Sequence, residues 1–351
     1  MTGSAQPVDL LPPRVPFSVL ERGGHLGGTT AEQAVQDVVD VATTAEAHGY
    51  HRVWVAEHHA AGKSASSAPA VLIAHIAALT ERIRVGSGGV MLPNHPPFTV
   101  AEQFATLQAL HPGRIDLGIG RSSGGSTQGH RLLEAALRRA PDASARFPEQ
   151  VDELLGFLHH RGPQQHRFHA LPLTPHTAGV PEVHVLGAGE NSARLAAERG
   201  LPFVYGHHLS RTIRRPSAVA RYRSAFRAGS DGARPRLLVS VQVVCAETDE
   251  LAESLALRTA AYVVAHSDLA PDGPPSPARE EFLAREALEE YAVVHGAPAR
   301  VAAELEALVT EFGADELMIV PFELTALARC RTLRLTAAAR RVRPAERTAR
   351  S

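Results

Sequence analysis

The chain has 351 residues, of which 44% are hydrophobic and 21% charged, and its formal net charge is −1. This ordinary globular composition excludes a disordered chain, an acidic tail protein and a nucleic-acid binder that relies on bulk basicity. The length lies between two ordinary domains and one large barrel.

Short strand-like segments alternate with longer helical patterns along almost the whole chain. The predicted strands are 16–20, 52–56, 83–89, 114–120, 182–186, 202–205, 236–245 and 316–320. Helices are predicted at 31–48, after Ser67, at 98–110, in stretches ending near 160, and at 191–199, 211–228, 249–265, 299–312 and 324–341. Thr30 and Gln33 have the spacing of a capping box, and Gly49 ends the first helix.

Eight such βα units predict a single parallel (β/α)8 TIM barrel of the α/β class, with two doubly wound halves divided near residue 170 as the alternative. We expect residues 1–14 and 336–351 to be flexible tails. The segment 266–279 contains four prolines and a glycine and interrupts the alternation. It is interpreted either as a surface linker or as a mobile lid over the site.

The cysteine content and the N-terminal sequence favour a reducing compartment. Cys245 and Cys330 are the only cysteines, so the sequence offers no disulfide framework. The first 14 residues do not resemble a signal peptide, and the longest apolar stretches fall short of the roughly 20 residues that span a membrane. We therefore expect a soluble, cytoplasmic protein.

Glycines and ionisable side chains gather where predicted strands end, which is where barrel enzymes place their active sites. These residues are Glu57, His58 and His59, then Gly88 and Gly89, then Gly118, Gly120 and Arg121, then Gly187, Ala188 and Gly189, and finally Gly206, His207 and His208. Any one group is explained by a turn or a surface ion pair. Five successive strand ends of this kind favour a ligand site, in which glycines let a ligand approach the backbone and histidines transfer protons.

Two more specific interpretations are disfavoured. Glu57, His58 and His59 lack the two histidines four apart of a metalloprotease helix, so no metal site is predicted. The segment 187–192 follows a strand and opens a helix, but Ser192 takes the place of the third glycine of a dinucleotide fingerprint, and no acidic residue ends the next strand. A helix N-terminus together with Arg121 instead suits a single phosphate.

Six segments of the chain resemble the bacterial luciferase-like flavin monooxygenases. They are WVAEHH (54–59), RVGSGGVMLPNH (84–95), AEQF (101–104), PGRIDLGIGR (112–121), AAERGLP (196–202) and GADELM (313–318). The resemblance spans roughly residues 16–335, and the run from 54 to 121 is its most specific part. Within the family the chain is most similar to oxygenases of aromatic polyketide pathways, such as the mensacarcin pathway.

The resemblance implies a barrel, usually dimeric, that uses reduced FMN and O2. A separate flavin reductase would supply the FMNH2, and a small organic substrate would be oxygenated through a flavin C4a-peroxide. His58 matches the family's catalytic histidine, and His59, His207 and His208 are further candidates. The Gly88–Gly89 bond matches a cis peptide beneath the flavin ring.

For the cofactor, Arg121 matches a phosphate-binding arginine, and Gly187, Ala188, Gly189 and Ser192 fall where relatives hold the same phosphate. Asn94 is also assigned to the cofactor site. Bacterial luciferase has a reactive cysteine at the position of Gly120, and acidic and serine side chains at those of Ala188 and Gly189. Phosphate contacts at these two positions would therefore come from backbone N–H groups.

Three alternatives remain. A deazaflavin (F420)-dependent dehydrogenase shares the barrel and many motifs but transfers hydride without O2. A non-catalytic flavin-binding protein would hold oxidised FMN without turnover. A nicotinamide enzyme of Rossmann type is the weakest, because the acidic residue for the ribose is missing.

Overall fold

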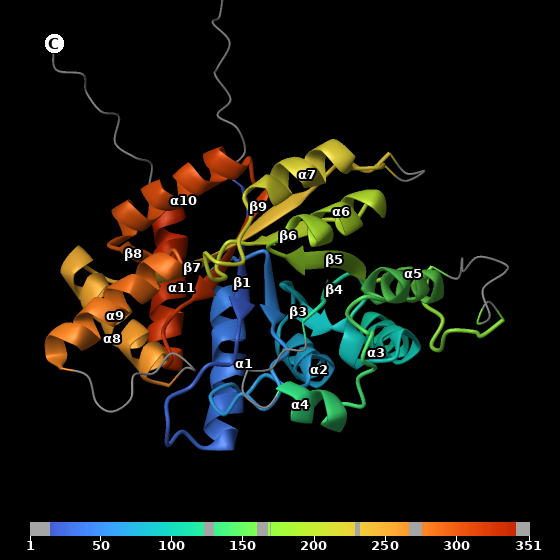
Figure 1. Cartoon of the computed structure of the whole chain (residues 1–351), viewed down its shortest axis with the longest axis horizontal. Helices are drawn as coiled ribbons and strands as arrows, with labels where there is room; N and C mark the ends of the chain where they lie inside the picture. Colours follow the sequence, from blue (N-terminus) through green and yellow to red (C-terminus); the bar gives the residue numbers. More distant parts are fainter. Residues whose placement is uncertain are drawn as a thin grey trace, which may run out of the picture.

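Eight parallel strands close into a barrel at the centre of the molecule (Figure 1). The computed structural model describes residues 15–122, 130–159, 168, 170–228, 232–266 and 276–341. The barrel strands are β1 (Phe17–Glu21), β2 (Arg52–Val55), β3 (Arg84–Met91), β4 (Ile115–Gly120), β5 (Glu182–Gly187), β6 (Phe203–Gly206), β7 (Leu237–Cys245) and β9 (Glu316–Pro321). Successive strands pair from β1 to β7, and β9 closes the ring between β7 and β1. The predicted (β/α)8 barrel is confirmed, and two doubly wound halves are excluded.

Helices surround the barrel and bury its outer face. They are α1 (Ala31–Ala47), α2 (Pro69–Leu79), α3 (Pro97–Leu110), α4 (His130–Ala136), α5 (Phe147–Leu158), α6 (Glu190–Glu198), α7 (Ser217–Ala225), α8 (Asp249–Ala265), α9 (Pro277–Glu290), α10 (Pro298–Phe312) and α11 (Ala326–Arg341), with a 3₁₀ turn η1 (Leu92–Asn94). Local signals set many of their ends. The Thr30 side chain accepts the Gln33 N–H at the start of α1, and Gly313 ends α10 in the left-handed conformation.

The segment after α8 differs from the prediction. Residues 267–275 of the candidate lid lie outside the described part of the chain, but Ser276 caps α9 and Pro277 is its first residue. Helix α9 packs beside α8 at one edge of the barrel (Figure 1) through small residues that include Ala256, Ala260, Ala284 and Ala287. A short strand, β8 (Val294–Gly296), then adds to the end of β7. The sequence analysis missed α9 and β8 because the prolines obscured the start of the helix.

The predicted C-terminal tail is also shorter than expected. Helix α11 continues to Arg341, so residues 336–341 are helical rather than a flexible tail, and Ala337 and Ala339 are buried. This correction has a simple cause: the helix still has an apolar face here, which packs against the barrel. The remaining tails, 1–14 and 342–351, lie outside the described residues.

The interior of the barrel is filled in layers, because alternate residues of each strand point inward. The middle layer is apolar and contains Leu20, Trp54, Val204, Leu238, Met318 and Val320. Below it, at the N-terminal ends of the strands, Arg52 lies between Asp116, at 2.7 Å, and Glu316, at 2.8 Å. Arg84, Arg236 and Glu182 complete this layer of three arginines and three carboxylates.

The charges of this lower layer cancel, and the layer holds several strands together. Burial by itself would lower the pKa of Arg52, but Asp116, Glu316 and Glu182 raise it above its ordinary value. Removing one partner of such a buried pair leaves an uncompensated charge, which costs about 3–5 kcal/mol. This layer therefore closes the lower end of the barrel and stabilises the fold. Because the lower end is closed, we expect the ligand site at the opposite end.

Within the described residues, no helix is long and apolar enough to span a lipid bilayer.

Candidate active site

Three cationic or titratable side chains from different strand ends converge at the upper mouth of the barrel. Arg22 follows β1, His58 follows β2 and His208 follows β6. Arg22 influences the pKa of both histidines, and His58 that of His208, so the three side chains lie near one another. The sequence analysis placed His58 here but missed Arg22.

Hydrogen bonds fix the orientation of the His58 ring. Its Nδ1 lies 3.3 Å from the carbonyl oxygen of Arg22 and 3.3 Å from Ser64 Oγ. The Ser64 hydroxyl already donates to that same carbonyl at 2.7 Å, so both neighbours accept and His58 Nδ1 carries the hydrogen. Among the described residues no partner is recorded for Nε2, which is therefore available to a ligand.

Burial first, and then the charge of Arg22, lower the pKa of His58 to about 4. The imidazole is therefore neutral at pH 7. With Nδ1 protonated, its free Nε2 is a proton acceptor.

The two histidines after β6 face opposite ways. Burial and the Arg214 charge lower the pKa of His207 to about 4; its Nε2 lies 3.2 Å from Arg214 and its ring packs on Phe312 of α10. His207 thus lies outside the mouth, contrary to expectation. His208 occupies the inward position, with Nδ1 2.7 Å from Ser240 Oγ. The alternation of β6 explains this correction, because Gly206 and His208 point inward while Tyr205 and His207 point outward.

Glu57 joins the loop after β2 to the loop after β3. Its Oε1 accepts hydrogen bonds from His59 Nε2 at 2.8 Å and His95 Nε2 at 2.9 Å, and its Oε2 accepts the Met91 N–H at 3.2 Å. Burial favours the neutral acid, but hydrogen bonds from His95 and His59 outweigh it and lower the pKa of Glu57. His59 is therefore held by Glu57 rather than presented to the mouth.

Glu57, His59 and His95 also form a group with metal-ligand chemistry, since their ligand atoms lie within 4.8 Å of one another. The same atoms satisfy one another as two N–H donors and a carboxylate. Their hydrogen bonds thus account for the arrangement without an ion. We interpret the group as a support that positions the loop carrying His58.

The floor beside His58 is built from glycines. The Gly88–Gly89 peptide bond is cis, as the resemblance implied. A Cβ on Gly88 would lie 2.4 Å from Leu20 Cδ1, and one on Gly89 would lie 2.8 Å from the Gly118 carbonyl oxygen. No side chain fits at either position, because Leu20 and the Gly118 carbonyl group already fill the space beside them.

A pocket of about 220 Å³ lies beside the mouth and contains the predicted phosphate residues Arg121 and Ser192. Its wall includes the first turn of α6, which begins after Gly189; glycine has no side chain to cap this turn, so its N–H groups stay available. A Cβ on Gly187 would lie 2.4 Å from Ser192 Oγ, so glycine lets strand and helix approach closely. Ala188 is buried between them.

Arg139 is a further residue that the sequence analysis missed. It donates to Asn94 Oδ1 at 2.6 Å and to the carbonyl oxygens of Arg121 at 3.3 Å and Ser122 at 3.2 Å. Asn94 in turn lies 3.4 Å from Glu57. Asn94 therefore belongs to the network that ties the Arg121 loop to the β2 and β3 loops. No motif marks Arg139, because its partners come from distant loops.

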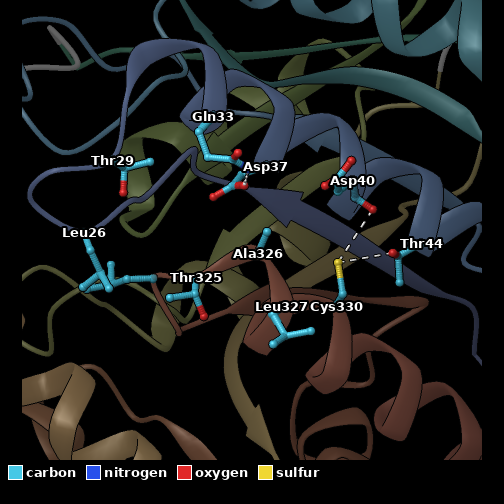
Figure 2. Close-up of a pocket in the computed structure, with 11 residues that line it drawn as sticks. Leu26, Thr29, Gln33, Asp37, Asp40, Thr44, Thr325, Ala326, Leu327 and Cys330 are labelled. Atoms are coloured by element: carbon cyan, nitrogen blue, oxygen red, sulfur yellow. Dashed lines mark hydrogen bonds between the residues drawn. The ribbon is translucent and has the colours of Figure 1, made fainter.

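A larger groove, of about 580 Å³, runs between α1 and α11 on the outside of the barrel (Figure 2). Figure 2 shows Cys330 Sγ directed at Thr44 and at the backbone of Asp40, at 3.2 and 3.7 Å. None of the predicted site residues lines this groove. It is separate from the mouth of the barrel.

The comparisons with known proteins identify the family of the chain. The family model for luciferase-like monooxygenases matches residues 15–316, so the chain belongs to this family. It is 43% identical over 241 residues to the uncharacterized protein YwcH of Bacillus subtilis, covering 69% of this chain and 71% of YwcH. It is 35% identical over 314 residues to a luciferase-like monooxygenase of Escherichia coli K12, covering 87% and 91%.

Solved structures agree on the fold. Apo-MsnO8 superposes with a TM-score of 0.78 at 33% identity over 95% of this chain and all of that one. The 3,6-diketocamphane monooxygenase in complex with FMN has a TM-score of 0.67 at 20% identity and covers 92% and 97%. An F420-dependent secondary alcohol dehydrogenase reaches the same TM-score at 15% identity and covers 94% and 100%. Of these neighbours, one was solved with FMN and another with an F420 adduct, and family membership supports a monooxygenase for this chain.

Proposed function

We propose that the protein is a monooxygenase that uses FMNH2 and O2 to oxygenate a small organic substrate. The observation that carries this proposal is the pocket lined by Arg121 and Ser192, together with the Gly88–Gly89 backbone of β3, a strand whose end is hydrogen-bonded to the loop that carries His58. The first suits a phosphate and the second a flat ring. Reduced FMN, when bound, activates O2 and supplies the electrons for the reaction.

The residues present fit the phosphate of FMN. Arg121 supplies a charge-assisted donor, and the Ser192 hydroxyl and the first N–H groups of α6 supply neutral ones. Since Ala188 and Gly189 offer no polar side chain, the backbone has to replace the acidic and serine groups of luciferase. Gly187, which packs directly against Ser192, makes that close approach feasible.

His58 has the role of proton acceptor or hydrogen-bond acceptor toward the substrate through Nε2. Its Nδ1 is held by the Arg22 carbonyl, and its imidazole is neutral at pH 7. A positioned base near the reacting atoms is what proton transfer requires. His208 lines the same mouth, where its pKa, lowered to about 3 mainly by burial, keeps it neutral as well.

The substrate is proposed to be an aromatic polyketide-type molecule. The resemblance of the sequence to oxygenases of aromatic polyketide pathways supports this class. We also propose that a separate cytoplasmic reductase supplies the FMNH2.

The proposal is tested by mixing the protein anaerobically with photoreduced FMN or with reduced F420, and then adding O2. We expect FMNH2 to bind and to be reoxidised in a single first-order phase, unlike free FMNH2. Binding of reduced F420 alone, with anaerobic hydride transfer to a secondary-alcohol-derived ketone, would establish the dehydrogenase alternative. Tight binding of oxidised FMN with unchanged reoxidation of FMNH2 would indicate a non-catalytic flavin protein.

Arg121→Ala provides a residue-level test of the cofactor site. Loss of a charge-assisted hydrogen bond costs about 1.5–3 kcal/mol, so FMN should bind roughly ten- to a hundredfold more weakly. Riboflavin, which lacks the phosphate, should be unaffected, as measured by calorimetry. The control Arg285→Ala removes an exposed arginine paired with Glu253 and Glu281 and should leave both affinities unchanged. Equal FMN affinity in the Arg121 variant would remove this residue from the phosphate site.

We further propose a homodimer formed through α2. This helix, PAVLIAHIAAL, has no charged residue, and a helix that is apolar all round is normally buried. Leu72, Ile73 and Ile76 face the barrel, whereas Val71 is 69% exposed and Leu79 is 53% exposed. A second copy of the chain would cover this outer face.

A further inference from the structure

We propose that Arg22 is an anion-binding group at the mouth of the barrel, so that the substrate carries a carboxylate or a similarly acidic group beside the atom that is oxygenated. This inference rests on the proposed function and specifies its substrate class. No sequence motif marks Arg22, and it was not among the residues that the resemblance assigned.

The register of β1 places Arg22 inside the barrel. Ser18 lies in the lower polar layer against Glu316, and Leu20 lies in the apolar middle layer. Arg22 is the next residue in this inward series, one layer higher, at the level of the candidate active site. Its effect on the pKa of His58 and His208 agrees with that position.

The side chain of Arg22 is half-buried at the mouth and has no partner there. Within the described residues, it makes no recorded hydrogen bond or ion pair, although it carries five N–H donors. The nearest carboxylate in sequence, Glu21, points outward, where it accepts the Gly23 N–H at 2.6 Å and lies 3.2 Å from Arg329 Nε. Burial lowers the pKa of Arg22, and the attraction of Glu21 does not compensate. Arg52, in the lower layer, is by contrast surrounded by carboxylates.

An arginine that faces a ligand site without a counter-ion is available for a charge-assisted pair, so the ligand is the group that supplies the negative charge. The neighbouring groups do not supply it. His58 and His208 are neutral at pH 7, since their pKa values are lowered to about 4 and about 3. The remaining groups that affect Arg22 are the phenol of Tyr291 and a second cation, Arg329.

The backbone holds Arg22 in place for this role. Its carbonyl oxygen accepts the Ser64 hydroxyl at 2.7 Å, and the next residue, Gly23, accepts the Ala65 N–H at 2.9 Å. Arg22 and His58 are thus fixed to the same segment. The phosphate pocket at Arg121 follows β4, three strands away around the ring. The phosphate of FMN and the acidic group of the substrate therefore have separate binding positions.

The test compares two probes of nearly the same shape, benzoate and benzamide, which differ in charge. Calorimetry on the wild-type chain should show benzoate binding about tenfold or more tightly than benzamide, as expected for a charge-assisted pair. Arg22→Gln should abolish this preference, and Arg22→Lys should retain part of it. Arg334→Gln, at an exposed arginine 3.6 Å from Glu247, should behave as wild type.

Two results would overturn the inference. One is equal binding of both probes by the wild-type chain, and the other is an undiminished benzoate preference in Arg22→Gln. Binding of oxidised and reduced FMN to Arg22→Gln is measured in parallel, and unchanged oxidised FMN binding shows that the variant is folded. If Arg22→Gln weakens only the binding of anionic FMNH2 and keeps the preference for benzoate, Arg22 would be assigned to the flavin instead. Benzoate binding needs no turnover. The test of Arg22 can therefore fail while the proposed oxygenation holds, and the reverse is also possible.

Discussion

At the scale of single residues, histidines at the strand ends acquire different chemistry from the groups that they contact. His58 donates through Nδ1 to the Arg22 carbonyl and keeps Nε2 free, whereas Nε2 of His59 is bonded to Glu57. His207 packs against Phe312 outside the barrel. Only His58, of these three predicted histidines, combines an inward position with a free nitrogen.

The protonation state of His58 is directly measurable. We predict a neutral ring with the hydrogen on Nδ1 from pH 8 down to about pH 5, because burial and Arg22 lower its pKa to about 4. Nitrogen-15 shifts of labelled imidazoles report both the tautomer and the pKa, and His58→Gln identifies the signal. Arg22→Gln should raise the pKa, since it removes a positive charge. A His58 ring that titrates near 6.5 in the wild-type chain would contradict this account.

Glu323, which follows β9, should make stability depend on pH in the opposite sense to an ordinary carboxylate. It is 4% exposed, one carboxyl oxygen accepts the Thr332 hydroxyl at 2.6 Å, and burial raises its pKa from 4.5 to about 7. The folded state therefore holds the proton more tightly than the unfolded chain. The resulting stabilisation is complete below pH 4.5 and is lost as the pH rises through 7, by about 3 kcal/mol in all.

Urea unfolding of the wild-type chain and Glu323→Gln between pH 5 and 8 measures this contribution. The free energy of unfolding should fall with pH more steeply in the wild-type chain than in the variant. Parallel curves for the two chains would show that Glu323 does not titrate in this range.

At the scale of elements, strand β3 shows how packing dictates sequence near the site. Gly86 lies beside Trp54 of β2 and Asp116 of β4, and Gly88 lies beside Trp54 and Leu20, so a Cβ at either position would collide with them. The large Trp54 ring takes up the space inside the barrel next to β3, so this neighbouring strand has room only for glycine.

Gly88→Ala should therefore destabilise the barrel. Overpacking of this kind typically costs about 1–3 kcal/mol, because Leu20 or the strand has to move. Chemical denaturation measures the loss. Gly62→Ala, where nothing lies within 4 Å of the added carbon, is the matched control and should change stability little. Equal stability of the two variants would mean that Leu20 moves aside without cost.

At the scale of the whole molecule, the barrel separates stability from function along its axis. The lower end is closed by the charge-balanced layer around Arg52, and the upper end carries free or weakly paired groups. Outside, α2 presents Val71, His75, Ala78 and Leu79 on one face. This uncharged stripe is the surface through which we propose dimerisation.

Val71→Glu combined with Leu79→Glu should convert the dimer to a monomer, because four charges would be buried in the interface. Sedimentation velocity gives the mass in solution. Ile213→Glu combined with Leu327→Glu adds the same charge at positions that are 52% and 85% exposed on other faces, and should remain dimeric. A monomeric wild-type chain, or dissociation of the control as well, would count against α2 as the interface.

The sequence by itself determined the barrel and its order of elements. The alternation of strand and helix patterns, Thr30 as a cap and the runs at 54–59 and 84–95 are local signals, and each depends on residues close together in the chain. The same signals located the strand ends, hence the loops that carry His58, the Gly88–Gly89 bond, Arg121 and Ser192. Prolines obscured the start of α9, so that helix and β8 were missed.

The tertiary structure alone decided which of these residues meet and how they are charged. Arg22 and Arg139 carry no motif, because their environments come from loops far away in sequence. The inward position of His208 rather than His207 follows from the exact phase of a four-residue strand, which sequence patterns leave uncertain by one residue. A shift of one residue reverses the direction of a side chain, and burial then sets its pKa, so the chemistry of the mouth depends on the closed barrel.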